Sequence, residues 1–243
     1  MLLTSCRVDT VTSLSVKANG SGTVSVTVTA DSDVYKAAPT LKTDVRNDDL
    51  TAAGWNMNGP HETKDGGLTV TFTHGFNTPA EATVLLGQVN GARGPLKSVV
   101  LQRTGKSSNS TFTLTGKLEV NGGLQAFADD AALKLLGGAP YADQVKNSGL
   151  DLGKAVGIDF TAELPGKVVS STGAAKGSVL TWRVPTDGTP TDIATTTNNV
   201  DIASNVARFL KWVVAFLLAV WVIGTLALLG LIASRRGRRA PRI

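Results

Sequence analysis

"VDTVTSLSVKANGSGTVSVTV", residues 8–28, carries the pattern that decides the fold. Every second residue on either side of the tetrapeptide Asn19-Gly20-Ser21-Gly22 is apolar or β-branched, as a strand with one buried face requires. These alternating residues are Val8, Thr10, Thr12, Leu14 and Val16 before the turn, and Val24, Val26 and Val28 after it. Because Asn-Gly is a strong turn signal, the stretch predicts an antiparallel β-hairpin.

Further strands are predicted from the same alternation. Residues 55–63 and 68–74 flank the turn Lys64-Asp65-Gly66-Gly67, and residues 97–103 and 111–120 flank a second polar loop. A last group of strands is predicted at residues 155–164, 168–171 and 178–184. Together the strands indicate a mostly antiparallel sheet built from hairpins.

Helices are predicted between the hairpins. Thr78-Pro79-Ala80-Glu81 has the form of a capping box with proline at the first helical position. Short helical patterns also cover residues 47–53, which end at Gly54, and residues 124–136. We therefore predict one α+β domain over residues 7–190. The Thr/Asn-rich residues 191–211 are predicted to be a polar spacer.

"WVVAFLLAVWVIGTLALLGLIA", residues 212–233, contains no charged residue. As a helix its 22 residues would span about 33 Å, against a hydrocarbon core of about 30 Å. A buried core helix is the weaker interpretation, because this segment has no polar face. It is predicted to be a transmembrane helix.

Arginines after this segment predict its orientation. Residues 234–243 carry five of them: Arg235, Arg236, Arg238, Arg239 and Arg242. Since such residues stay on the cytoplasmic side, we expect the C-terminal tail inside and the large domain outside, with the tail in contact with anionic lipid. The opposite topology, a cytosolic domain with a tail anchor, would require these arginines to cross the membrane.

The charge of the remaining chain excludes one class of function. The whole sequence has 24 Lys and Arg residues against 19 Asp and Glu residues, and without the five tail arginines the two counts are equal. A large domain without net charge does not have the basic composition typical of nucleic-acid binding, so no nucleic-acid partner is expected.

Cys6 is the only cysteine, so it forms no disulfide within the chain. Leu3-Thr4-Ser5-Cys6 matches the lipobox that directs acylation of a bacterial lipoprotein cysteine, which makes residues 1–6 the predicted remnant of a signal peptide. An accidental cysteine near the terminus is the alternative. Because the helix at residue 212 emerges too late to export the domain alone, we expect a basic and apolar segment to be encoded upstream of Met1.

Catalytic and metal-binding signatures are weak. His61 and His74 belong to one predicted hairpin, but two histidines without a patterned carboxylate make a poor metal site. Signatures of a nucleophilic serine are absent. Asp48-Asp49 and Asp129-Asp130 stand near predicted helix starts, where carboxylates cap amides. We predict no enzymatic activity, no metal and no cofactor.

Several turn and helix-start motifs resemble one known family. The motifs, in chain order, are Leu3-Thr4-Ser5-Cys6, Asn19-Gly20-Ser21-Gly22, Ala53-Gly54-Trp55, Thr78-Pro79-Ala80-Glu81-Ala82, Leu164-Pro165-Gly166 and Thr181-Trp182-Arg183-Val184-Pro185. With the C-terminal span they look like the LppM-type lipoproteins of actinobacteria. The resemblance implies an exported, membrane-attached domain that contacts envelope lipids or glycolipids and has no established reaction.

The predicted function is that of a non-enzymatic envelope lipoprotein with an apolar groove for a lipid or glycolipid. The predicted lining residues are apolar or aromatic side chains on helix and strand faces: Trp55, Leu85, Leu86, Val89, Phe127, Leu135 and Trp182. For each residue taken singly, ordinary core packing is the favoured interpretation. A scaffolding module that recruits another envelope protein is the alternative, and an envelope hydrolase is a more distant one.

Overall fold

The computed structural model of the chain describes residues 7–45, 47–90, 94–106, 109–120, 155–185, 189–200 and 202–236. Within the last range, side chains are described for residues 209–226 and 229. The chain divides into two units, one through Asn199 and the other from Val200 onward. The first unit holds both sheets, and the second holds a long helix.

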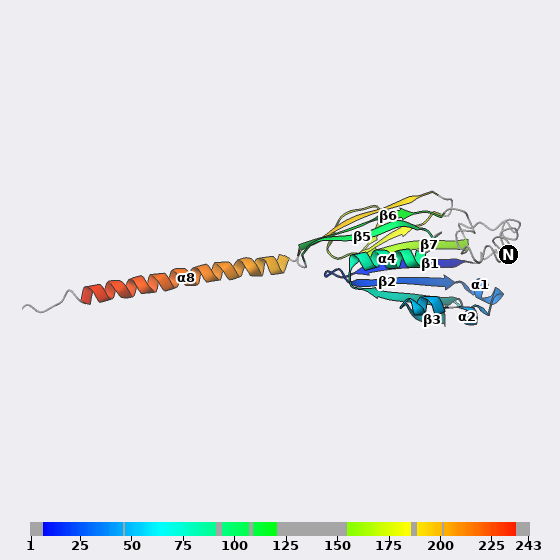
Figure 1. Cartoon of the computed structure of the whole chain (residues 1–243), viewed down its shortest axis with the longest axis horizontal. Helices are drawn as coiled ribbons and strands as arrows, with labels where there is room; N and C mark the ends of the chain where they lie inside the picture. Colours follow the sequence, from blue (N-terminus) through cyan, green and yellow to red (C-terminus); the bar gives the residue numbers. More distant parts are fainter. Residues whose placement is uncertain are drawn as a thin grey trace, which may run out of the picture. The chain divides into compact units, whose positions relative to one another are not determined.

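Two β-sheets form the first unit (Figure 1). The larger has seven strands in the order β3-β4-β2-β1-β7-β10-β9, with bounds β1 Val8–Val16, β2 Gly22–Ala30, β3 Asn56–Glu62, β4 Leu68–Phe76, β7 Val156–Glu163, β9 Ala174–Lys176 and β10 Val179–Arg183. The smaller has four strands in the order β5-β6-β11-β8, with bounds β5 Leu96–Lys106, β6 Asn109–Leu118, β8 Lys167–Ser171 and β11 Thr191–Val200. The predicted α+β class with mostly antiparallel sheets is confirmed.

The hairpin of residues 8–28 lies at the centre of the larger sheet. β1 pairs antiparallel with β2 from Val8 opposite Ala30 to Val16 opposite Gly22, as its alternation predicts. On its other side β1 pairs in parallel with β7. The predicted hairpins β3–β4 and β5–β6 are also confirmed. The parallel pair was not predicted, because its strands lie far apart in the sequence and no local pattern reports on such pairing.

Four helices of the first unit are described, and two of them were predicted. α3 (Asp48–Ala52) ends before Gly54, whose φ of +87° suits a residue without a Cβ. α4 (Pro79–Asn90) begins as the capping box predicts, with the Glu81 amide donating to Thr78 Oγ1 at 3.2 Å. α1 (Ser32–Ala37) and α2 (Leu41–Asp44) were not predicted, since neither has a long apolar repeat.

The hydrophobic core lies between the inner faces of the two sheets and α4. Its least exposed large side chains come from both sheets and the helix: Leu14, Val24, Leu86, Phe112, Leu114, Leu118, Phe160, Leu180 and Ile193. α4 packs against β5 and against β2 and β4, so its face with Ala82, Leu85 and Leu86 is buried. The long core residues leave little free volume along most of this interior.

The prediction of a polar spacer from residue 191 is wrong. Thr191–Val200 forms β11, which pairs with β8 within the smaller sheet. Ile193, Thr195 and Thr197 point inward and are at most 2% exposed. Threonine is β-branched and tolerates burial when its hydroxyl is bonded, as that of Thr197 is to the Pro165 carbonyl at 2.9 Å. The domain therefore extends past the predicted boundary at residue 190.

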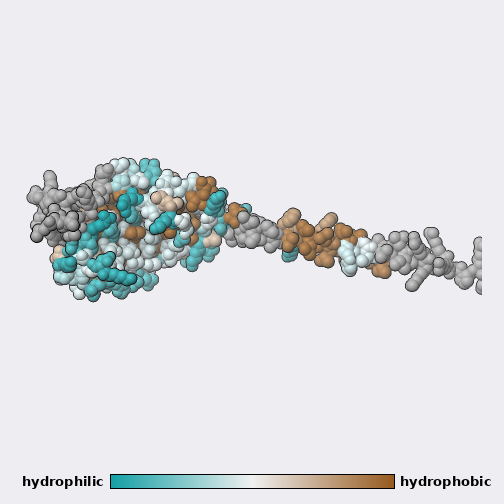
Figure 2. All heavy atoms as spheres, turned by 180° about the vertical axis from the view of Figure 1, so that it is seen from behind, coloured by the Kyte–Doolittle hydropathy of each residue, from teal (hydrophilic) through white to brown (hydrophobic). Residues whose placement is uncertain are grey.

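The second unit contains α8 (Ile202–Arg236), which is longer than the predicted span of 212–233. Its window Phe209–Leu226 has a mean hydropathy of 2.2 and is 0% buried. The side chains that Figure 2 colours along this helix are largely apolar. This is one helix apolar enough and long enough to cross a membrane.

Candidate functional site

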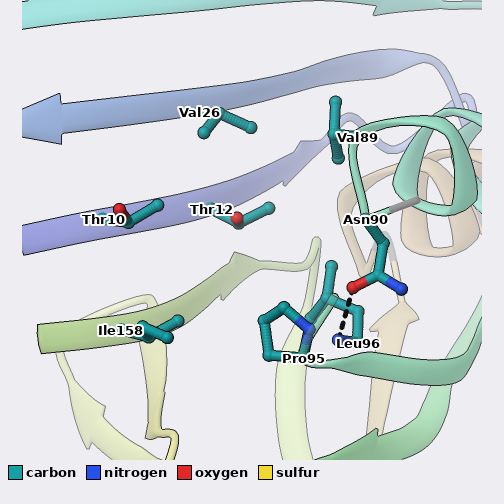
Figure 3. A pocket seen from close by; sticks show the side chains of 8 residues that line it. All are labelled: Thr10, Thr12, Val26, Val89, Asn90, Pro95, Leu96 and Ile158. Carbon is teal, nitrogen blue, oxygen red and sulfur yellow. Dashed lines mark hydrogen bonds between the residues drawn. The ribbon is translucent and has the colours of Figure 1, made fainter. Parts of the chain in front are cut away.

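An apolar pocket opens between the larger sheet and the C-terminal end of α4 (Figure 3). Its volume is about 120 Å³. The lining residues come from three neighbouring strands, from α4 and from the start of β5: Thr10, Thr12, Val26, Val89, Asn90, Pro95, Leu96 and Ile158. The sheet forms its floor, and the helix end and β5 form one wall.

The sequence of β1 explains why the pocket lies there. Thr10 and Thr12 share the inner face of β1 with Leu14 and Val16, because alternate residues of a strand point to the same side. Leu14 and Val16 are buried, whereas the shorter threonines leave the inner face half-buried. Ile158 pairs with Thr10, and Val26 pairs with Thr12. The step from long to short side chains thus creates the hollow.

The two threonines also give the apolar pocket a polar component. Neither hydroxyl has a hydrogen-bond partner among the described residues, although Thr27 and Thr71 of the same sheet bond to each other at 3.0 Å. A hydroxyl both donates and accepts. Thr10 and Thr12 are therefore available to a carbonyl or hydroxyl group of a bound molecule.

One side chain, that of Asn90, holds together the wall formed by α4 and β5. Asn90, the last residue of α4, accepts a hydrogen bond from the Leu96 amide at its Oδ1, at 2.6 Å. Figure 3 shows this bond at the rim of the pocket, beside Pro95. The bond ties the end of α4 to the beginning of β5, which holds Val89 and Leu96 in place.

The predicted lining residues are mostly core residues. Trp55, Leu85, Leu86 and Trp182 are at most 6% exposed and none lines the pocket. Val89 is half-buried and does line it. Phe127 and Leu135 lie outside the described residues. For the four buried residues, ordinary core packing is the explanation that the structure supports.

The predicted anchor residues are covered only in part. Cys6 lies outside the described residues. Arg235 and Arg236 belong to α8, whereas Arg238, Arg239 and Arg242 lie outside the described residues.

His61 and His74 do not come together. His61 pairs with Thr69 across the β3–β4 hairpin, so His74 is five residues further along β4. Within the described part of the chain, no three His, Cys, Asp or Glu side chains are grouped so that they could hold a metal. His74 instead packs edge-on against Trp55, with ring centroids 5.4 Å apart. This contact is typical of a core boundary.

A second hollow of about 410 Å³ lies beside two arginines, Arg7 and Arg183. Each is paired: Arg7 with Asp9 at 2.7 Å, and Arg183 with Asp159 at 2.9 Å. The hydrogen bonds and charges of these carboxylates raise the pKa of both arginines above its usual value. Because the cations are already neutralised, this hollow is a poor site for an anion.

Most of the pocket residues were missed by the sequence analysis. Asn90, Pro95 and Leu96 join the pocket only through the packing of α4 and β5, which no local pattern reports. Thr10 and Thr12 did give a signal, since they are short polar residues on an otherwise apolar strand face.

Comparisons with known proteins find a distant structural neighbour. No family model matches the chain, and no curated protein matches it. Among solved structures, the chain is similar to the folded domain of the Mycobacterium tuberculosis LppM protein, determined by NMR. The similarity covers 83% of this chain and 96% of that one, with a TM-score of 0.45 and 14% identity.

Proposed function

We propose that the protein is a membrane-anchored, non-enzymatic envelope protein whose first unit binds the apolar end of a lipid or glycolipid in the pocket between β1 and α4. α8 attaches it to the membrane, and its arginine-rich end lies on the cytoplasmic side. Acylation of Cys6 would add a second attachment. The LppM-type lipoprotein is the class that this proposal assigns to it.

The observation that carries the proposal is the lining of the pocket. Val26, Val89 and Ile158 offer apolar contact, and the unpaired hydroxyls of Thr10 and Thr12 lie on the floor. A lipid has matching parts, because its ester or amide carbonyls and headgroup hydroxyls adjoin methylene chains. Binding sites for such molecules are typically apolar clefts with a few placed polar groups.

The size of the pocket limits what enters it. A volume of about 120 Å³ equals about four waters, at ~30 Å³ each, and lies below the ~300–1,000 Å³ typical of drug-sized ligands. The proposal is therefore restricted to the end of one chain or a short branched group.

The same small volume supports scaffolding as the second candidate. β8 is an edge strand of the smaller sheet, and its residues Val168 and Val169 are 37% and 60% exposed. An exposed edge is a surface to which an extended segment of another protein can add as a strand. Replacing Val169 by Lys would block such a partner without altering the pocket.

Lipid binding is tested by filling the pocket. We expect full-length protein extracted in mild detergent to retain lipid, detected by native mass spectrometry, and Val89→Trp to lose most of it. Val84→Trp is the matched control, because Val84 lies on the same helix but is 59% exposed and outside the pocket. Equal lipid retention by both variants, or no lipid in the unmodified protein, would contradict the proposal and favour scaffolding.

A further inference from the structure

Four lysines gather at one end of the first unit, each from a different loop or strand end. They are Lys17 in the β1–β2 turn, Lys106 at the end of β5, Lys167 at the start of β8 and Lys176 at the end of β9. All four are exposed, and none forms an ion pair among the described residues. We call this set the basic end.

The strand registers place these lysines together. Lys17 follows Val16, and the parallel β1–β7 pair sets Ser15 opposite Glu163. Glu163 in turn pairs with Val179, and Val179 with Lys176, across β10. The β1–β2 turn and the β5–β6 tip share this end in Figure 1.

The smaller sheet adds the other two lysines to the same end. Lys167 pairs with Asn198, and Thr111 near the start of β6 donates a hydrogen bond to Asn198 Oδ1 at 3.0 Å. Lys106 is opposite Asn109 at that start. The end of β11 therefore lies among the lysines.

Two of the described acidic side chains lie at this end, and neither forms an ion pair with a lysine of the basic end. Glu81 accepts a hydrogen bond from the Asn77 amide at 2.8 Å, and Glu163 accepts one from the Ser178 hydroxyl at 2.6 Å. The opposite end differs, because there Arg7 pairs with Asp9 and Lys42 with Glu62. Among the described side chains of this end, four lysines thus stand against two carboxylates, which leaves a local excess of positive charge.

The basic end is also where the chain continues into α8. β11 ends at Val200, α8 begins at Ile202, and the apolar window begins at Phe209. Only residues 201–208 separate the end of β11 from this apolar window. This short connection tethers the basic end to the segment that is predicted to cross the membrane.

Exposed valines accompany two of the lysines. Val169 lies two residues after Lys167 and is 60% exposed, and Val179 lies three residues after Lys176 and is 36% exposed. Val200, 50% exposed, ends β11 at the same place. Lysine beside a small apolar side chain suits the bilayer interface, where the cation meets a headgroup phosphate and the apolar group meets the acyl boundary.

We propose that the basic end, Lys17, Lys106, Lys167 and Lys176, is a contact surface for anionic phospholipid headgroups. This contact is independent of the pocket at the other end of β1 and needs neither acylation of Cys6 nor a particular direction of insertion. It holds the first unit against the bilayer into which its own helix is inserted.

The test uses the full chain with Cys6→Ser, reconstituted into nanodiscs. A fluorophore on Ala18→Cys, in the β1–β2 turn, is quenched by a nitroxide on the lipid headgroups. We expect more quenching in discs with phosphatidylglycerol than in discs of phosphatidylcholine alone, and loss of this excess at high salt. A second protein labelled at Asp65→Cys, in the β3–β4 turn, should show no such excess.

Two charge variants decide the outcome. Replacing the four lysines of the basic end by Gln should abolish the excess quenching of the label at residue 18. Replacing Lys36, Lys42, Lys64 and Lys97 by Gln changes the net charge equally and should leave it intact. Equal quenching in both lipids, or equal loss in both variants, would overturn the proposal. Circular dichroism of each variant verifies that the fold is retained.

Discussion

Threonine residues occupy inward-facing positions in both sheets, although threonine is a polar residue. Thr195 and Thr197 are buried because their hydroxyls bond to Ser171 Oγ and the Pro165 carbonyl. Thr10 and Thr12 lie on an equivalent inner face but have no such partners among the described residues. The same residue type is thus packed in the core in β11 and lines the pocket in β1. Whether the hydroxyl has a partner separates the two cases.

A substitution in β11 tests the role of the buried hydroxyl. Thr197→Val keeps the shape but leaves the Pro165 carbonyl without its donor, which should lower the free energy of unfolding by about 1–2 kcal/mol. Thr196→Val, one residue away and half-exposed, should change it by less than about 0.5 kcal/mol. Urea unfolding of the full-length protein in detergent measures both. Equal effects would show that the bond contributes nothing to stability.

At the scale of elements, the alternation of apolar residues was sufficient for most strands. The hairpins β1–β2, β3–β4 and β5–β6 follow directly from local pattern and turn residues. β11 was missed because its inward positions are mainly threonines, which resemble a spacer when only apolar residues are counted. β9, three exposed residues long, has no buried face to leave a pattern.

The candidate site was less predictable than the fold for a related reason. Its floor comes from β1, β2 and β7, and its wall from α4 and β5, so it exists only once these elements pack. Apolar residues on one helix face predict burial but do not distinguish the core from a pocket. Leu85 and Leu86 are buried in the core. Val89, one turn further along α4, reaches the pocket because the helix ends there.

α4 also allows a stabilising substitution. Gly87 lies within the helix, and a Cβ added there meets no atom within 4 Å. Gly87→Ala should therefore raise the free energy of unfolding by about 0.5–1 kcal/mol, because alanine loses less backbone entropy in a helix. Thermal unfolding measures the change.

The control for this prediction is Gly22→Ala at the start of β2. Its Cβ would overlap the Ser15 carbonyl oxygen and lie 2.5 Å from the Phe76 ring, so this variant should be destabilised. Destabilisation by Gly87→Ala as well would mean that α4 requires flexibility at this turn.

At the scale of the whole molecule, the charges fall into two sets with different roles. Arginines follow the apolar part of α8, and unpaired lysines form the basic end that precedes it. Arginine and lysine residues close to a span favour the cytoplasmic side. The flank that carries more of these basic residues therefore stays in the cytoplasm. The five tail arginines exceed Arg208 and Lys211, the basic residues immediately before the span, and so predict that the tail stays inside.

This orientation has a direct consequence for protease access. Protease added to intact spheroplasts should degrade the first unit and leave a small membrane fragment that contains α8, detected with a tag after Ile243. Cys6→Ser should give the same pattern, because a spanning helix holds the protein in the membrane without a lipid. Replacing the five tail arginines by Gln reverses the charge bias, because Arg208 and Lys211 remain before the span, and should increase the fraction of protected protein. A first unit that stays intact until the membrane is permeabilised would place it in the cytoplasm, and the envelope role would then be wrong while headgroup contact by the basic end would still stand.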